Sequence, residues 1–166
     1  MRKIAIIAAI LFSAGCLYAQ EGYDEISSPS FFAAPVIETV WYGRTSPSIG
    51  YGFSIGSEGI ISIGLKGIYA MPLAEFEITT LEVTLFFRVY LPVTGPVSGF
   101  FTQLTYGFAV FSRENQISLP ADGGTFSLGL TAGWRFPIGS RFFIEPYIRG
   151  GYPYYGGAGL CAGVRF

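Results

Sequence analysis

Apolar and polar residues alternate one by one along most of this chain, and the pattern is cleanest over its last nine residues. There, one set of alternate positions is entirely apolar, and the other set is small or charged. The first set is Ala158, Leu160, Ala162, Val164 and Phe166; the second is Gly159, Cys161, Gly163 and Arg165. Strict alternation is the period of a half-buried β-strand. The sequence therefore predicts a strand that runs to an aromatic residue at its end.

Turn residues divide residues 31–166 into eight segments of strand length. Most of these segments reach the ~9–11 residues that a tilted strand needs to cross a bilayer. The predicted strands are Phe31–Tyr42, Ser48–Gly56, Gly59–Ala70, Thr79–Leu91, Gly99–Ser112, Thr125–Phe136, Arg141–Tyr152 and Gly157–Phe166.

The two faces of these segments differ in bulk as well as in polarity. In the fourth segment, Leu81 and Leu85 share one face, whereas Glu82, Thr84 and Arg88 share the other. From the second segment to the eighth, every charged residue falls on this second face, which is also rich in glycine. The interior of an eight-stranded barrel is only wide enough to be filled by side chains, so the bulky face would overfill it. The bulky face is therefore expected to point outward.

We predict an all-β fold, an eight-stranded antiparallel up-and-down transmembrane β-barrel whose bulky face contacts lipid. The alternative is a soluble secreted barrel or sandwich, which would bury its apolar face instead. Pro35 and Pro146 lie inside predicted strands, where proline removes a backbone hydrogen bond. At Pro146 we expect a bulge or a shortened strand.

The start of the chain is typical of an exported protein. Arg2 and Lys3 precede a short apolar run that ends near Ala19, which predicts a signal peptide over residues 1–19. Residues 20–30 are acidic and turn-rich and are expected to form a disordered periplasmic lead-in to a barrel over residues 31–166. Cys16 offers an alternative, because the three residues before it resemble a lipobox and would make it a lipidated first residue.

Composition narrows the function classes further. Half of the residues are apolar (51%) and only 13% are charged. Without the predicted signal peptide, eight basic and eleven acidic residues remain, a net charge of −3. With no basic cluster, a nucleic-acid partner is not expected. The chain contains no histidine, which removes the usual general base and the commonest metal ligand. We therefore expect no enzymatic activity and no cofactor or metal.

Charged residues on the inner face are expected to pair across the lumen, because a buried charge is costly unless it is paired. Arg88 and Glu145 are the best candidates for a cross-lumen pair. Glu38, Glu82 and Glu145 are alternative candidates for acid–base groups. The predicted lumen charge network consists of Glu38, Lys66, Glu82, Arg88, Arg135, Glu145, Arg149 and Arg165.

From about Phe31 to Phe166 the chain resembles the small eight-stranded outer-membrane barrels of the OmpA/OmpX/OmpW type, on its strand pattern and its terminal Phe166. The resemblance implies a location in the bacterial outer membrane, surrounded by its lipid. It also implies escort by periplasmic chaperones and insertion by BAM-type machinery, for which Phe166 would be the assembly signal. The eight-stranded outer-membrane palmitoyltransferases and deacylases depend on a catalytic histidine, which this chain lacks.

Two functions remain open at this stage. The first is a non-enzymatic outer-membrane protein with a structural, surface-binding or adhesion role. Its longer loops, residues 71–78 and 113–124, would contact host or surface ligands. The second is a narrow channel for small apolar or ionic solutes, with OmpW-like activity.

Overall fold

The structure is a computed structural model that describes residues 30–41, 47–73, 78–92, 98–113 and 123–166. The predicted signal peptide and nearly all of the lead-in lie outside these residues, and so does Cys16. The described part contains eight strands: β1 (Phe31–Trp41), β2 (Ser48–Ser57), β3 (Ile61–Pro72), β4 (Ile78–Pro92), β5 (Gly99–Arg113), β6 (Gly124–Ile138), β7 (Phe142–Tyr152) and β8 (Gly156–Arg165).

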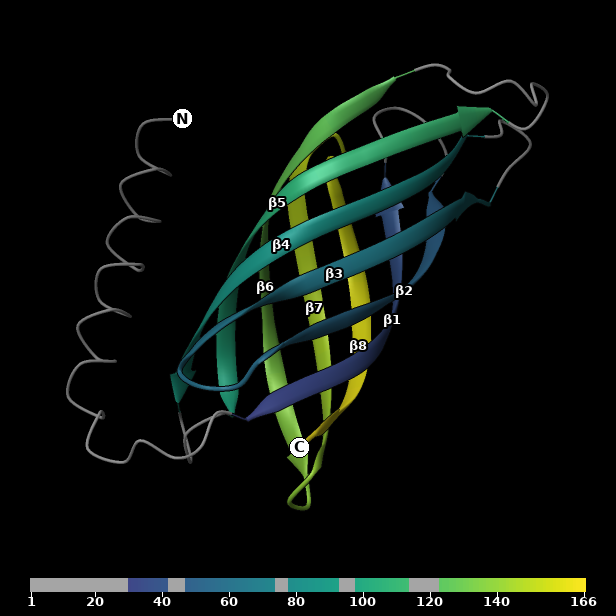
Figure 1. The fold of residues 1–166 in the computed structure, drawn as a ribbon. Coiled ribbons are helices and arrows are strands. Elements are labelled where there is room, and N and C mark those ends of the chain that lie inside the picture. The colour runs from purple at the N-terminus through teal and green to yellow at the C-terminus, as the bar shows by residue number, and fades with distance from the viewer. Residues whose placement is uncertain (1–29, 42–46, 74–77, 93–97, 114–122) are drawn as a thin grey trace.

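The eight strands form one closed antiparallel barrel in which each strand pairs with its neighbours in sequence. The barrel closes because β1 also pairs with β8, for example Ile37 with Leu160. Figure 1 shows this closure as the purple strand β1 beside the yellow strand β8. The predicted fold class is confirmed.

Side chains alternate between the outside of the barrel and its lumen, as the sequence pattern predicts. Leu85 and Leu130 point outward and are 56% and 54% exposed, whereas the neighbouring Thr84 and Thr131 are buried. The lumen is filled by charged residues together with aromatic rings such as Phe101 and Phe143. No helix among the described residues is long and apolar enough to span a membrane. A belt of exposed leucine, isoleucine and aromatic side chains surrounds the closed barrel, as lipid contact requires.

The two rims of the barrel differ in what they carry. Phe31 and Phe166 meet at one rim, where the amide of each donates a hydrogen bond to the carbonyl of the other, at 2.9 and 3.0 Å. At this end, called the terminal rim here, β1, β3, β5 and β7 begin and β2, β4, β6 and β8 end. At the opposite end, called the loop rim, β1, β3, β5 and β7 end and the other four strands begin.

Neither proline produces the distortion that the sequence led us to expect. Strand β7 runs through Pro146 without interruption. Its pairing with β6 stops after Tyr147–Gly133 and resumes at Ile144–Phe136 in the same register. The expected bulge or shortened strand at Pro146 is therefore wrong: two residue pairs are skipped, and no residue is inserted. Pro35 behaves in the same way, because the pairing of β1 with β8 is skipped at its position and resumes in register.

Strand boundaries differ from the prediction by one or two residues. Strand β3 begins at Ile61 because Gly59 has a positive φ and belongs to the turn before it. Strand β3 ends at Pro72 and strand β4 begins at Ile78, so the first predicted ligand-binding loop is shorter than residues 71–78. Arg113 and Gly124 likewise belong to strands, and residues 114–122 of the second loop lie outside the described residues.

Candidate functional site in the barrel lumen

Buried charges of both signs occupy the lumen in equal numbers. In the described part of the chain, the ion pairs join four carboxylates to four cations whose side chains are at most 7% exposed. The carboxylates belong to Glu38, Glu58, Glu82 and Glu145, and the cations to Lys66, Arg88, Arg135 and Arg149. These groups fall into two clusters at different depths of the barrel, and each cluster contains two charges of each sign.

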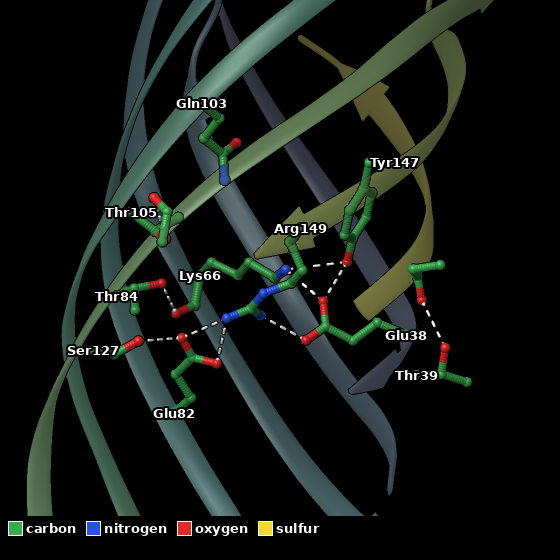
Figure 2. A network of polar contacts seen from close by, with 12 residues as sticks. Glu38, Thr39, Lys66, Glu82, Thr84, Gln103, Thr105, Ser127, Tyr147 and Arg149 are labelled. Atoms are coloured by element: carbon green, nitrogen blue, oxygen red, sulfur yellow. Dashed lines mark hydrogen bonds and ion pairs between the residues drawn. The ribbon is translucent and has the colours of Figure 1, made fainter. Parts of the chain in front are cut away.

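The loop-side cluster consists of Glu38, Lys66, Glu82, Ser127, Tyr147 and Arg149, and Figure 2 shows it from close by. Glu38 is its most heavily bonded carboxylate. Lys66 Nζ lies 2.7 Å from Glu38 Oε2, and Arg149 Nη1 lies 2.6 Å from Oε1. The Tyr147 hydroxyl donates a third hydrogen bond to Oε2, at 2.5 Å. The sequence analysis placed Glu38 in the lumen charge network, and closure of the barrel brings its partners from β3 and β7 to it.

Arg149 connects Glu38 to the second carboxylate of the loop-side cluster. Its Nη2 lies 2.7 and 2.8 Å from the two carboxylate oxygens of Glu82. Ser127 donates to the same carboxylate at 2.7 Å. On the loop-rim side, Tyr154 lies with its ring centroid 3.7 Å from the guanidinium carbon of Arg149 and is almost fully buried. Tyr154 therefore covers the cluster from the loop rim.

The terminal-side cluster consists of Glu58, Arg88, Tyr90, Gln103, Arg135 and Glu145. Glu145 is fully buried and bonds to Arg88 Nη1 at 2.9 and 3.0 Å, to the Tyr90 hydroxyl at 3.0 Å, and to Arg135 Nε. Arg88 also donates from Nε to Gln103 Oε1 at 2.8 Å. Charge-assisted bonds of this kind are roughly twice as strong as neutral ones, which offsets much of the cost of burying the ions.

Aromatic rings pack against both arginines of the terminal-side cluster. The guanidinium carbon of Arg135 lies 3.8 Å from the centroid of the Phe143 ring, and that of Arg88 lies 4.3 Å from the centroid of Phe101. Cations bind favourably to the faces of aromatic rings, more so where water is excluded. The rings thus fill the lumen and stabilise its cations at the same time.

Glu58 is the charged member of the terminal-side cluster that sequence reasoning missed. It lies in the β2–β3 connection, and its Oε1 accepts a hydrogen bond from Arg135 Nη1 at 2.5 Å. Arg165, which the sequence placed in the network, contributes only a 3.9 Å contact from its Nε to Glu58 Oε2. Burial raises the pKa of Glu58 and outweighs the opposing effect of Arg135. Glu58 was detectable, since it continues the inward-facing positions Ser54 and Gly56 beyond the end of β2.

The space between the two clusters is small. Lys66, Arg88, Gln103 and Cys161 are among the residues that line a cavity of about 10 Å³ there. Such a volume holds about one water molecule. Cys161 is a free cysteine, buried at this level. Among the described residues, no group of three or more histidine, cysteine or acidic side chains is placed to hold a metal ion.

Comparison of the sequence with known protein families and with characterised proteins finds no match. Solved structures do match. Neisserial surface protein A superposes with a TM-score of 0.64 at 11% identity, over 84% of this chain and 96% of that one. The N-terminal β-barrel domain of Pseudomonas aeruginosa OprF gives 0.53 at 16% identity, over 84% of this chain and all of that one. A de novo designed transmembrane β-barrel gives 0.50 at 10% identity, with coverages of 84% and 98%.

These likenesses concern the fold alone, because all three identities are low. Together with the exposed apolar belt and the charged lumen, they define the class of this protein: it is a small eight-stranded transmembrane β-barrel.

Proposed function

We propose that this protein is a non-enzymatic integral protein of the bacterial outer membrane, which acts by holding surface-exposed loops on a closed barrel. In this reading the terminal rim faces the periplasm and the loop rim faces outward. The proposed partners are outer-membrane lipid, the chaperones and BAM-type machinery that insert the barrel, and host or surface ligands of the loops.

The observation that carries the proposal is the filling of the lumen by two clusters of paired charges. Side chains occupy the barrel interior at two depths, and the cavity between them has room for about one water molecule. A barrel filled in this way favours a role for its outer surfaces over a role for its interior. The narrow channel is therefore the second candidate, and the same experiment tests both.

The experiment combines a conductance measurement with a binding measurement. The purified barrel, reconstituted in planar bilayers, should show no discrete conductance steps, and reproducible steps would favour the channel instead. Cells that carry the protein should bind a host matrix or cell surface, and they should lose that binding when residues 114–122, between β5 and β6 in the sequence, are replaced by a Gly-Ser linker. The same replacement of residues 93–97, between β4 and β5 in the sequence, is the matched control and should leave binding unchanged.

A further inference from the structure

The small cavity between the two charge clusters is built by the whole circumference of the barrel. Each of the eight strands contributes one side chain to its lining, for example Val36 from β1 and Cys161 from β8. Lys66 of the loop-side cluster and Arg88 of the terminal-side cluster both line it. Its volume of about 10 Å³ is close to the minimum that one water molecule needs. Closure of the barrel therefore creates one site, in the middle of the lumen, at which the two clusters meet.

Two buried cations at this site have N–H groups to spare. Lys66 Nζ carries three N–H groups and uses two of them, on Glu38 Oε2 at 2.7 Å and on the Tyr147 hydroxyl at 3.0 Å (Figure 2). Arg88 uses its Nε and Nη1 groups within the terminal-side cluster, so the two N–H groups of its Nη2 are left over among the described residues. Both residues are at most 6% exposed. Because a buried donor without a partner is costly, the site favours a guest that accepts hydrogen bonds.

The rest of the lining limits what this guest can be. Ser54 and Thr131 bring buried hydroxyl groups, whose oxygens can accept a hydrogen bond from a guest. Val36 and Cys161, which lie opposite each other where β1 pairs with β8, close the site with weakly polar surface. A water molecule can accept from the N–H groups and donate to a hydroxyl at the same time. A halide ion only accepts, is larger, and would add a charge between two clusters whose charges already balance.

We infer that this cavity binds one water molecule, which accepts hydrogen bonds from Lys66 and Arg88 and donates one to the Thr131 hydroxyl. Three hydrogen bonds are typical of a buried water in a protein. The water joins the loop-side and terminal-side clusters into one network. This assignment goes beyond the ion pairs, because it gives the lumen a ligand site. It does not depend on the proposed surface role, since it rests on the lumen alone.

A crystal structure of the full chain, grown in sodium bromide, tests the site directly. The wild type should show one density peak within about 3.2 Å of Lys66 Nζ and Arg88 Nη2, without anomalous scattering from bromide. Val36→Ile adds one methyl group to the lining and should remove the peak. Val40→Ile makes the same change at a buried position of β1 outside the cavity and should keep it. A wild type without the peak, an anomalous signal at the peak, or a peak that persists in Val36→Ile would each overturn the inference.

Urea unfolding of the detergent-folded protein tests the hydrogen bond to Thr131 in solution. Thr131→Val removes the hydroxyl at nearly constant size and should raise the equilibrium constant for unfolding about fivefold, as expected for one lost hydrogen bond. In the Val36→Ile background, where the water is displaced, the same substitution should change that constant by less than about twofold. Thr84→Val, at a buried threonine outside the cavity, is the control and should have the same effect in both backgrounds. Equal effects of Thr131→Val in both backgrounds would overturn the inference.

Discussion

Arg88 and Glu145 meet inside the barrel, although 57 residues separate them in the sequence: Arg88 Nη1 lies 2.9 and 3.0 Å from the two carboxylate oxygens. Both side chains are buried, so removal of one leaves the other as an uncompensated charge. Arg88→Met or Glu145→Gln alone should lower the free energy of unfolding by about 3–5 kcal/mol.

A double-mutant cycle on this pair measures the coupling directly. Because the two groups share one network, the double variant should lose less free energy than the sum of the single variants. The measurement is urea unfolding of the detergent-folded protein. Leu85→Ala and Ile148→Ala, on the outward faces of the same two strands, form a control cycle that should be additive. Additivity of both cycles would contradict coupling between Arg88 and Glu145.

Two neighbouring positions on β6 test which face contacts lipid. Leu130→Arg places a charge on the exposed face and should destabilise the bilayer-inserted barrel by about 2–4 kcal/mol. Thr131→Arg instead adds bulk and charge to the filled lumen, so its effect should persist in every folded environment. Folding titrations into vesicles measure the first effect, and a Leu130→Arg variant as stable as the wild type would contradict lipid contact at this face.

Two glycines of β3 provide a test of lumen packing. A Cβ atom at Gly64 would lie 2.1 Å from the carbonyl oxygen of Ile55 and 2.4 Å from a ring carbon of Phe86, whereas a Cβ atom at Gly67 would meet nothing within 4 Å. Gly64→Ala should therefore destabilise the barrel by about 1–3 kcal/mol through overpacking. Gly67→Ala is the control and should leave the unfolding midpoint within error of the wild type.

Glu58 gives the stability a defined pH dependence. Its pKa is raised in the folded barrel, so folding favours its protonated form. The stability associated with this group is present below its unfolded pKa and is lost as the pH rises through its folded pKa. The difference in unfolding free energy between the wild type and Glu58→Gln, measured by urea titration at a series of pH values, should therefore fall as the pH rises above 4.5. A difference that grows with pH would show that the attraction of Arg135 for the Glu58 carboxylate outweighs the effect of burial on the pKa of Glu58.

Phe166 is expected to matter more for assembly than for final stability. Its side chain is 71% exposed, and its backbone makes two hydrogen bonds to Phe31. Deletion should cost the refolded barrel about 1–3 kcal/mol, from two bonds at ~0.5–1.5 kcal/mol each. In cells, the same deletion should sharply reduce the protein found in the outer membrane. Phe166→Ala keeps the backbone and shows which part of the cellular effect belongs to the aromatic ring.

The sequence predicted the strands and their faces well because alternation is a local property that each strand expresses by itself. Glu38 and Arg149 could be placed in the lumen in this way, but their contact depends on the register around the whole barrel. Tyr154 could not be placed at all. Its position over Arg149 depends on space at Gly129, where a Cβ atom would lie 1.9 Å from the tyrosine hydroxyl.

Pro146 shows the opposite difficulty, because a local rule was applied too strongly. Proline removes one backbone donor, and we expected the strand to adjust its register or its length. The pairing of β7 with β8 continues through Pro146 opposite Leu160, and this second ladder keeps the strand in place. A single missing donor is tolerated where the strand on the other side remains paired.

The lumen contacts also have a kinetic consequence. Arg149 and Glu38 are 111 residues apart and Arg149 and Glu82 are 67 apart, so these ion pairs form only after the sheet has closed upon itself. Interactions that are absent from the transition state for folding do not speed folding, but they slow unfolding. The paired charges should therefore extend the lifetime of the finished barrel without helping it to insert.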